Sequence, residues 1–209
     1  MAIKQAHDNQ APYYFCTLTC YQWWPLIAQT NSYDAVYKWF DYLRKKQVEV
    51  VAYVIMPNHV HLLLYFPQPG YSLNRLISNA KRFLAYEISK RLKAANHTTV
   101  LTLLQQDLTP REQKKGQLHK VFEESFDAKA IYTEAFFRQK LDYIHHNPVS
   151  RRWQLAVDFT AYPHSSAAFY EVGFCDGFQP FDYRVLEGAS LLVQAGSPCA
   201  QKPGSEDPA

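Results

Sequence analysis

Two histidines separated by one residue are the first positions whose spacing suggests chemistry. His59 and His61 lie in the segment MPNHVHLL. On an extended strand they would point to the same face, with Cα atoms about 6.6 Å apart at ~3.3 Å per residue. Two imidazoles placed in this way can converge on one metal ion. An H-x-H pair is common, so two hydrogen-bonded histidines on a half-buried sheet are the structural alternative.

A second group of polar residues lies in the segment QKLDYIHHNP. Gln139, Tyr143 and Asn147 are spaced by four, so on a helix they form one stripe. A tyrosine hydroxyl and an amide oxygen one turn apart can face the same metal. The structural alternative is an amphipathic helix with a buried Tyr143 and an Asn147 that caps the helix before Pro148.

The surrounding pattern predicts the elements that position these residues. Strands are expected at 12–24, 48–56, 59–66 and 118–122, and helices at 32–46, 72–95 and 133–147. The first six elements match the ferredoxin-like or RRM-like split β-α-β-β-α-β arrangement, with helices on one face of an antiparallel sheet. We therefore expect an α+β fold with one additional helix, which carries Tyr143 and Asn147. Ser72 and Thr133 are expected helix N-caps, and residues 96–116 are expected to form a flexible insertion.

The composition is that of one globular domain. The 209 residues are 47% hydrophobic and 20% charged with only 7 glycines, which excludes collagen-like and low-complexity chains. We expect one domain over 1–187, with its core at 12–170 and a loose tail at 188–209. Four scattered cysteines predict free thiols. The start of the sequence lacks an apolar signal segment, and no run reaches the ~20 apolar residues of a membrane span, which favours a cytoplasmic protein without a membrane partner.

Positive charge is concentrated in one stretch of the chain. The net charge of +3 is too small to indicate a partner, but nine basic and three acidic residues between Lys81 and Lys120 give that stretch a charge of +6. Such clustering suits contacts with phosphates, although a solvated helix face is the alternative. The expected DNA contacts are Lys81, Arg82, Lys114, Lys115, Lys120, Arg151 and Arg152. Trp23, Trp24 and Tyr71 could stack on unpaired bases, with core packing as the alternative.

Together, the two polar segments resemble the single-tyrosine HUH transposases, small enzymes that move insertion sequences through single-stranded DNA. The segments MPNHVHLL, AKRF and YIHHNP are most similar to the REP-associated tyrosine transposase branch, and the resemblance covers roughly residues 12–170. Two features depart from it: the stretch before the fourth strand is longer, and Phe122-Glu123 stands where a Trp-Gln pair is usual.

The resemblance implies a site and a reaction. His59, His61 and Asn147 would hold a divalent ion, Mg²⁺ or Mn²⁺, and Tyr143 would be the nucleophile. A free tyrosine hydroxyl, with a pKa of about 10, needs such activation. Attack on a DNA phosphate would give a 5′-phosphotyrosine and a 3′-hydroxyl, and reversal would join strands without ATP. The implied function is a metal-dependent transesterase acting on single-stranded or hairpin DNA.

Several alternatives stay open at this point. An inactive or domesticated relative would bind hairpin DNA without cutting it, and a ferredoxin-like RNA-binding module would use the histidines structurally. His145 and His146 could shuttle a proton or contact a phosphate, but solvent-facing positions at a helix end are the alternative. His164 is a similar case. A DNA substrate implies nucleoid association in the cytoplasm, and the sequence leaves monomer and homodimer open.

Overall fold

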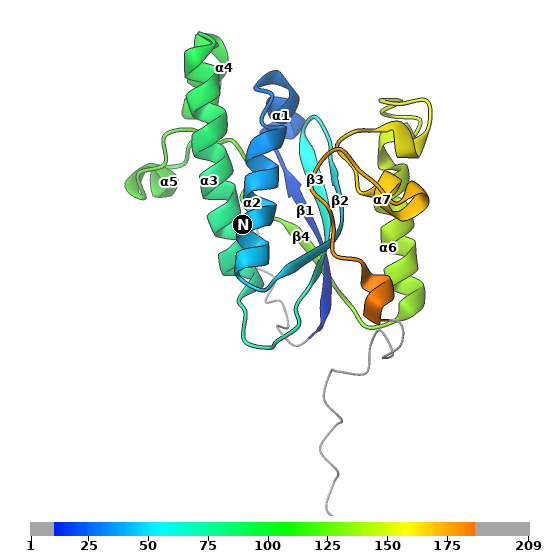
Figure 1. The fold of residues 1–209 in the computed structure, drawn as a ribbon. Coiled ribbons are helices and arrows are strands. Elements are labelled where there is room, and N and C mark those ends of the chain that lie inside the picture. The colour runs from blue at the N-terminus through cyan, green and yellow to red at the C-terminus, as the bar shows by residue number, and fades with distance from the viewer. Residues whose placement is uncertain (1–10, 187–209) are drawn as a thin grey trace, which may run out of the picture.

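The computed structural model describes residues 11–186 and has a four-stranded antiparallel sheet as its centre (Figure 1). The strand order is β2-β3-β1-β4. The strands are β1 (Tyr13–Thr19), β2 (Glu49–Ile55), β3 (His59–Tyr65) and β4 (Asp127–Ile131). This is the order of the split β-α-β-β-α-β arrangement, so the expected α+β, ferredoxin-like fold class is confirmed.

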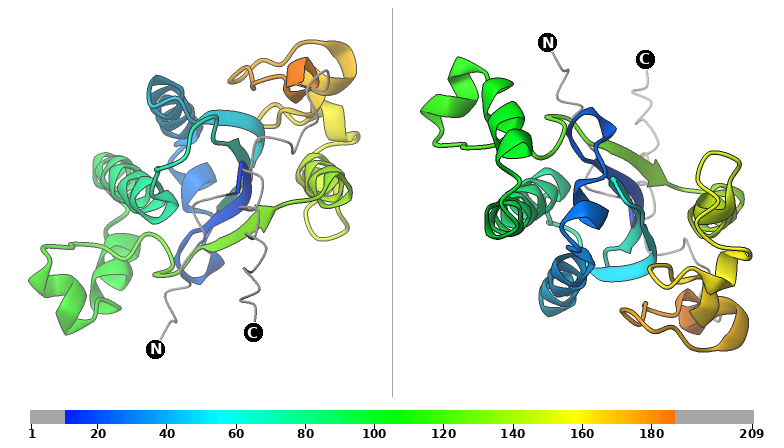
Figure 2. Two further views of the ribbon diagram at one scale, coloured as in Figure 1. Left: turned by 90° about the horizontal axis from the view of Figure 1, so that it is seen from below. Right: turned by 90° about the horizontal axis from the view of Figure 1, so that it is seen from above.

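Helices cover both faces of this sheet (Figure 2). On one side lie α2 (Tyr33–Lys45) and α3 (Leu73–Ala94), and on the other lie α6 (Glu134–His146) and the short α7 (Ala167–Val172). The alternation of β3 divides its side chains between the two sides. Val60, Leu62 and Leu64 belong to the core under α2 and α3, whereas Leu63 packs in a second cluster with residues of α6.

The helix ends follow from local side-chain chemistry. The Ser72 side chain accepts a hydrogen bond from the Arg75 amide, and Thr133 accepts one from the Phe136 amide. Both are the N-caps expected from the sequence, and each satisfies an amide that the first helical turn leaves without a partner. The Thr133 cap fixes where α6 begins and therefore which of its residues face the sheet.

The predicted fourth strand at 118–122 is wrong, and so is the predicted extent of the first strand. Strand β1 ends at Thr19, where the chain enters a 3₁₀ turn at Tyr21–Trp23. The 118–122 segment therefore finds little of β1 to pair with and makes only an isolated bridge between Phe122 and Cys20. The ladder with β1 forms later, at Asp127–Ile131. The apolar pattern of 118–122 instead reflects burial of Val121 and Phe122.

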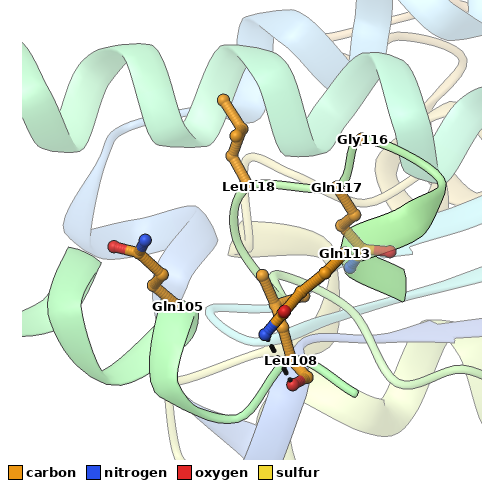
Figure 3. Close-up of a pocket in the computed structure, with 6 residues that line it drawn as sticks. All are labelled: Gln105, Leu108, Gln113, Gly116, Gln117 and Leu118. Carbon is orange, nitrogen blue, oxygen red and sulfur yellow. Dashed lines mark hydrogen bonds between the residues drawn. The ribbon is translucent and has the colours of Figure 1, made fainter. Parts of the chain in front are cut away.

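The expectation of a flexible loop at 96–116 is also wrong. The segment contains α4 (Thr98–Gln106) and α5 (Pro110–Lys114), and α5 begins with a capping box in which Thr109 and Glu112 bond each other's backbone amides. The sequence did not indicate α4 and α5 because Leu104 is the only fully buried residue in these two helices. They therefore lack the regular series of buried apolar residues by which a helix is predicted. A pocket between them is shown in Figure 3, and none of its lining residues is one of the predicted site residues. It is lined by Gln105, Leu108, Gln113, Gly116, Gln117 and Leu118.

The short 3₁₀ and helical segments complete the described chain. They are α1 (Leu26–Gln29), Asn147–Val149, Phe159–Ala161 and Tyr183–Leu186. Over residues 11–186, no helix is long and apolar enough to cross a membrane. The tail predicted at 188–209 lies outside the described residues, and the domain boundary at 187 stays a prediction.

Candidate active site

The two histidines of β3 lie side by side on the face of the sheet that α6 covers. In the register with β1, His59 is opposite Thr19 and His61 is opposite Thr17. Their ring centroids are 4.6 Å apart, and the residues are only 2% and 5% exposed. The i, i+2 spacing on a regular strand is what brings the rings together.

A hydrogen-bond chain fixes the tautomer of His59. The Asn58 Nδ2 donates to the Trp23 carbonyl oxygen at 2.7 Å, which turns the Asn58 Oδ1 toward the imidazole. This Oδ1 lies 2.6 Å from His59 Nδ1 and can only accept, so Nδ1 carries the proton. The other ring nitrogen, Nε2, therefore keeps its lone pair. Such an outer partner is typical of metal-binding histidines.

His61 lies between a threonine and the tyrosine of α6. Its Nδ1 is 2.9 Å from the Thr17 hydroxyl, and its Nε2 is 3.4 Å from the Tyr143 hydroxyl. The second distance is long for a hydrogen bond, so these atoms are adjacent rather than strongly bonded. Thr17 holds the ring from the neighbouring strand.

Burial keeps both rings neutral. It lowers the pKa of His59 to about 4, with a further contribution from the charge of Arg152. Burial also places the pKa of His61 well below its ordinary value, helped by His59 and Lys140. Both effects disfavour the imidazolium form, so near neutral pH the unprotonated nitrogens remain available as ligands.

Tyr143 is half-exposed above this pair. The residue is 46% exposed, and its ring centroid lies 5.1 Å from that of His61 and 5.9 Å from that of Phe15. The Lys140 ammonium, one turn earlier on α6, is 4.6 Å from the Phe15 ring centroid and 5.5 Å from that of Tyr143. The Tyr143 side chain thus combines access from solvent with a nearby cation.

Asn147 lies one helical turn beyond Tyr143, at the end of α6. It is 8% exposed, and among residues 11–186 its Oδ1 has no hydrogen-bond partner although the atom is buried. A buried acceptor without a partner costs free energy, so it calls for an explanation such as an ion. Asn147 is the C-cap residue of α6, as the structural alternative expected, and its backbone is right-handed helical.

The donor set fits a divalent cation. It consists of two neutral imidazoles and one unpartnered amide oxygen, which suit Mn²⁺ by ligand type and Mg²⁺ through the oxygen. Within the described ranges, no group of three or more His, Cys, Asp and Glu residues could hold a metal. A site made of His59, His61 and Asn147 is not such a group, because its third donor is an amide.

Of the seven expected DNA contacts, Arg152 lies near the histidines, and its charge helps to lower the pKa of His59. Its guanidinium lies 5.3 Å from the ring centroid of Trp23, which itself lies 5.5 Å from that of His59. Arg151, in the same turn after α6, is exposed. The structure therefore brings Arg152 to the neighbourhood of His59.

The other basic residues are distributed differently. The Lys81 ammonium donates to the carbonyl oxygens of Glu123 and Ser125 at 2.9 and 2.7 Å. Lys120 lies 4.8 Å from the Tyr21 ring centroid and 3.9 Å from the Glu112 carboxylate. Both cations thus have partners within the protein. Exposed positions are held by Arg82, Lys114 and Lys115, and Figures 1 and 2 show α5 and α6 on opposite sides of the molecule.

The histidines near the end of α6 have different surroundings. His145 is 5% exposed, and its Nε2 lies 3.0 Å from the Ser166 hydroxyl, so the solvent-facing alternative is wrong for this residue. His146 is exposed and paired with Asp142. His164 stacks on Tyr33 at 3.6 Å between ring centroids and contacts the Tyr37 hydroxyl. None of the contacts described here joins these three to the His59–His61 pair.

Sequence reasoning missed three residues of this region. The sequence pattern assigns no role at the site to Asn58, although its position beside His59 is a usable signal. Thr17 contacts His61 through strand register, which the sequence does not reveal. Nothing in the sequence pattern indicates that Lys140 approaches Tyr143.

Comparison with known proteins agrees with the resemblance drawn from the motifs. The model of the IS200-like transposase family matches residues 27–107, which include the histidine pair and end before Tyr143. The chain is thus similar to the IS200-like transposases over this part. No curated protein sequence matches it significantly.

Solved structures provide the likeness in fold. A REP-associated tyrosine transposase bound to a REP hairpin has a TM-score of 0.55 and 17% identity, over 96% of this chain and 100% of that one. A provisionally assigned transposase from Deinococcus radiodurans R1 has a TM-score of 0.36 and 17% identity, over 69% of this chain and 95% of that one, which is too weak to bear on the fold. The first comparison shows that the chain has the fold of a REP-associated tyrosine transposase.

Proposed function

We propose that this chain is a single-tyrosine transposase-type enzyme that cuts and rejoins single-stranded DNA at hairpins. The observation that carries the proposal is the 3.4 Å approach of the Tyr143 hydroxyl to His61 Nε2, one helical turn from the unpartnered Asn147 oxygen. A nucleophile beside two neutral imidazoles, with an unpartnered amide oxygen one helical turn further along α6, suits phosphoryl transfer better than RNA binding by a plain sheet.

The ligands of the metal follow from the donor atoms available. His59 and His61 would bind through Nε2 and Asn147 through Oδ1. A bound Mg²⁺ or Mn²⁺ would supply Lewis-acid stabilisation of the charge on the scissile phosphate. Thr17 and Asn58 orient the two imidazoles from outside, which preserves their geometry when DNA arrives.

Tyr143 would form the covalent bond. Its Oη attacks phosphorus, the bond from phosphorus to the 3′ oxygen breaks, and the proton lost by the tyrosine is gained overall by that 3′ oxygen. The products are a 5′-phosphotyrosine and a free 3′-hydroxyl. Attack by a 3′-hydroxyl on the phosphotyrosine reverses the step and restores Tyr143. The neighbouring Lys140 ammonium would stabilise negative charge on the phenolate and the phosphate.

DNA is the substrate favoured by the surroundings of the site. The transposase of the same fold was captured with a REP hairpin. Arg152 presents exposed positive charge near His59, and Arg151 precedes it in the same exposed turn. A hairpin would position the adjoining single strand at Tyr143. Activity on DNA would place the protein with the nucleoid in the cytoplasm.

Trapping of the covalent intermediate tests this proposal. Labelled DNA hairpins with single-stranded flanks are incubated with the protein and Mn²⁺ or Mg²⁺, then resolved under denaturing conditions. We expect a protein–DNA adduct that is absent with chelator and in Tyr143→Phe. The matched control is Tyr86→Phe, at a tyrosine that is 64% exposed on α3, which should form the adduct normally.

The other outcomes identify the alternatives. An adduct that persists in Tyr143→Phe would overturn the assigned nucleophile. Hairpin binding without any adduct would indicate a relative that binds without cutting. Tighter binding of RNA than of DNA hairpins would indicate an RNA-binding module.

A further inference from the structure

Trp23 is a large aromatic residue left half-exposed beside the buried histidines. Its indole is 48% exposed, while its ring centroid lies 5.5 Å from that of His59 in an edge-on arrangement. The alternative that Trp23 packs in the core is therefore wrong, because a core residue would be shielded from solvent. Trp24, the next residue, is the one of the pair that packs against the apolar core.

An unfavourable backbone conformation holds Trp23 in this place. Gln22 and Trp23 have φ values of 52° and 59°, so two consecutive residues other than glycine lie in the left-handed region. Such strain persists only where the surroundings enforce it, and it gathers at functional sites. Here the Gln22 amide donates to the Glu123 carboxylate at 2.8 Å, and the Trp23 carbonyl accepts from Asn58 at 2.7 Å. The Asn58 side chain that orients His59 therefore also anchors Trp23.

A cation from a different part of the chain meets the same indole. The Arg152 guanidinium, in the turn after α6, lies 5.3 Å from the Trp23 ring centroid and 5.6 Å from that of Trp153. The Trp153 ring in turn lies 5.7 Å from that of His59. Two indoles and an exposed guanidinium thus surround the outer side of His59, which is the combination that binds single-stranded nucleic acid through stacking and charge.

We propose that Trp23 and Arg152 form a stacking site for one unpaired base of the DNA strand, next to the phosphate held at the histidine pair. This inference rests on the proposed function and adds a positioning role, because a base fixed there sets which phosphate reaches Tyr143. Stacking is tolerant of sequence, since every base has an aromatic face. The site therefore selects unpaired over paired nucleotides rather than one base over another.

Equilibrium binding to two DNA arms tests the stacking site. The probes are a labelled DNA hairpin with an oligothymidylate arm and the same hairpin with an abasic arm of equal length and charge, in the non-cutting Tyr143→Phe background. We expect Trp23→Ala to weaken binding of the thymidylate arm by about 5- to 150-fold and to leave the abasic arm unchanged. Trp23→Phe should retain most of the affinity, and Phe174→Ala, at an aromatic residue that is 66% exposed, should bind both arms normally.

Photocrosslinking checks the same contact in the unaltered chain. A hairpin whose arm carries 5-iododeoxyuridine is irradiated with the protein, and the crosslinked peptide is sequenced. A crosslink at Trp23 supports the proposal. Crosslinks confined to other peptides, or an equal loss of affinity for both arms in Trp23→Ala, would overturn it.

The two proposals fail in different ways. If neither hairpin binds to the protein with Trp23 intact, DNA binding and with it the proposed function fail. If the thymidylate arm binds and Trp23→Ala changes nothing, only the stacking site fails.

Discussion

The face of the sheet beneath α2 and α3 differs from the face beneath α6 in what it buries. Strand β3 contributes Val60, Leu62 and Leu64 to the first, and all three are fully buried among apolar residues. To the second it contributes His59 and His61, which are also buried but carry polar side chains. Burial of apolar area stabilises a fold, whereas burial of an imidazole or amide has a cost unless it is bonded.

The comparison indicates how this fold supports the proposed site. One face supplies stability, and the other gives some of it up to hold neutral donors near a solvent-accessible tyrosine. The α6 face does contain its own apolar cluster, including Phe15, Phe137 and Ile144, which anchors the helix. The unpartnered Asn147 oxygen is the clearest sign that this face is not arranged for stability alone.

Truncation on the two faces should lower the free energy of unfolding by different amounts. Leu62→Ala is expected to lower the free energy of unfolding by about 2–5 kcal/mol, because it leaves a cavity in the apolar core. His61→Ala, the neighbouring position on the other face, should lower it less, because the cost of burying the imidazole is removed with it. Urea titrations measure both. The comparison would be contradicted if both variants lost the same free energy of unfolding and His61→Ala still formed the adduct.

Acid should weaken the α6 face specifically. Burial lowers the pKa of His59 and of His145 to about 4 from 6.5. Between these values the unfolded chain binds more protons than the folded one, so stability is complete above pH 6.5 and falls as the pH drops toward 4. Each histidine accounts for on the order of 3 kcal/mol at most.

Denaturant titrations at pH 7 and pH 5, in the presence of chelator, measure this loss. His145→Gln should reduce it, since one of the three buried histidines is then absent. Stability that stays flat from pH 7 to pH 5 would show that the histidines are not buried as described.

Replacement of Asn147 should separate stability from function. Asn147→Leu removes the buried oxygen without a partner, so we expect the free energy of unfolding without metal to stay level or rise by about 1 kcal/mol. The adduct should nevertheless be lost, because the leucine supplies no ligand. Calorimetric titration with Mn²⁺ provides the direct measurement. Unchanged Mn²⁺ affinity in this variant would remove Asn147 from the site.

Two lysines from the basic stretch should give small and different effects. Lys114→Gln, at an exposed position on α5, should leave stability within about 0.5 kcal/mol and, if it contacts DNA, reduce the salt slope of binding by about 1. Lys81→Gln should instead lower stability by about 1–3 kcal/mol, because it removes the donor to three backbone carbonyls. A larger loss of stability in Lys114→Gln than in Lys81→Gln would contradict the roles assigned to the two lysines.

Much of the fold was predictable because its signals are local. Alternation along β3 predicted that His59 and His61 share a face, and the period of α6 predicted that Tyr143 and Asn147 follow one stripe. Ser72 and Thr133 fixed helix starts through their own side chains.

What the sequence did not reveal depends on contacts between distant segments. The position of β4 was missed because pairing with β1 is decided by where β1 ends, not by the apolar pattern of 118–122. The contact of Thr17 with His61 depends on register. Burial of His145 depends on Ser166, which follows much later in the chain.

The identity of the residue that carries DNA in the trapped adduct tests the central claim most directly. The adduct is digested with protease and nuclease, and the nucleotide-bearing peptide is sequenced by mass spectrometry. The arrangement of His61, Asn147 and Tyr143 predicts a phosphonucleotide on Tyr143 alone. A phosphonucleotide on any other residue would contradict it.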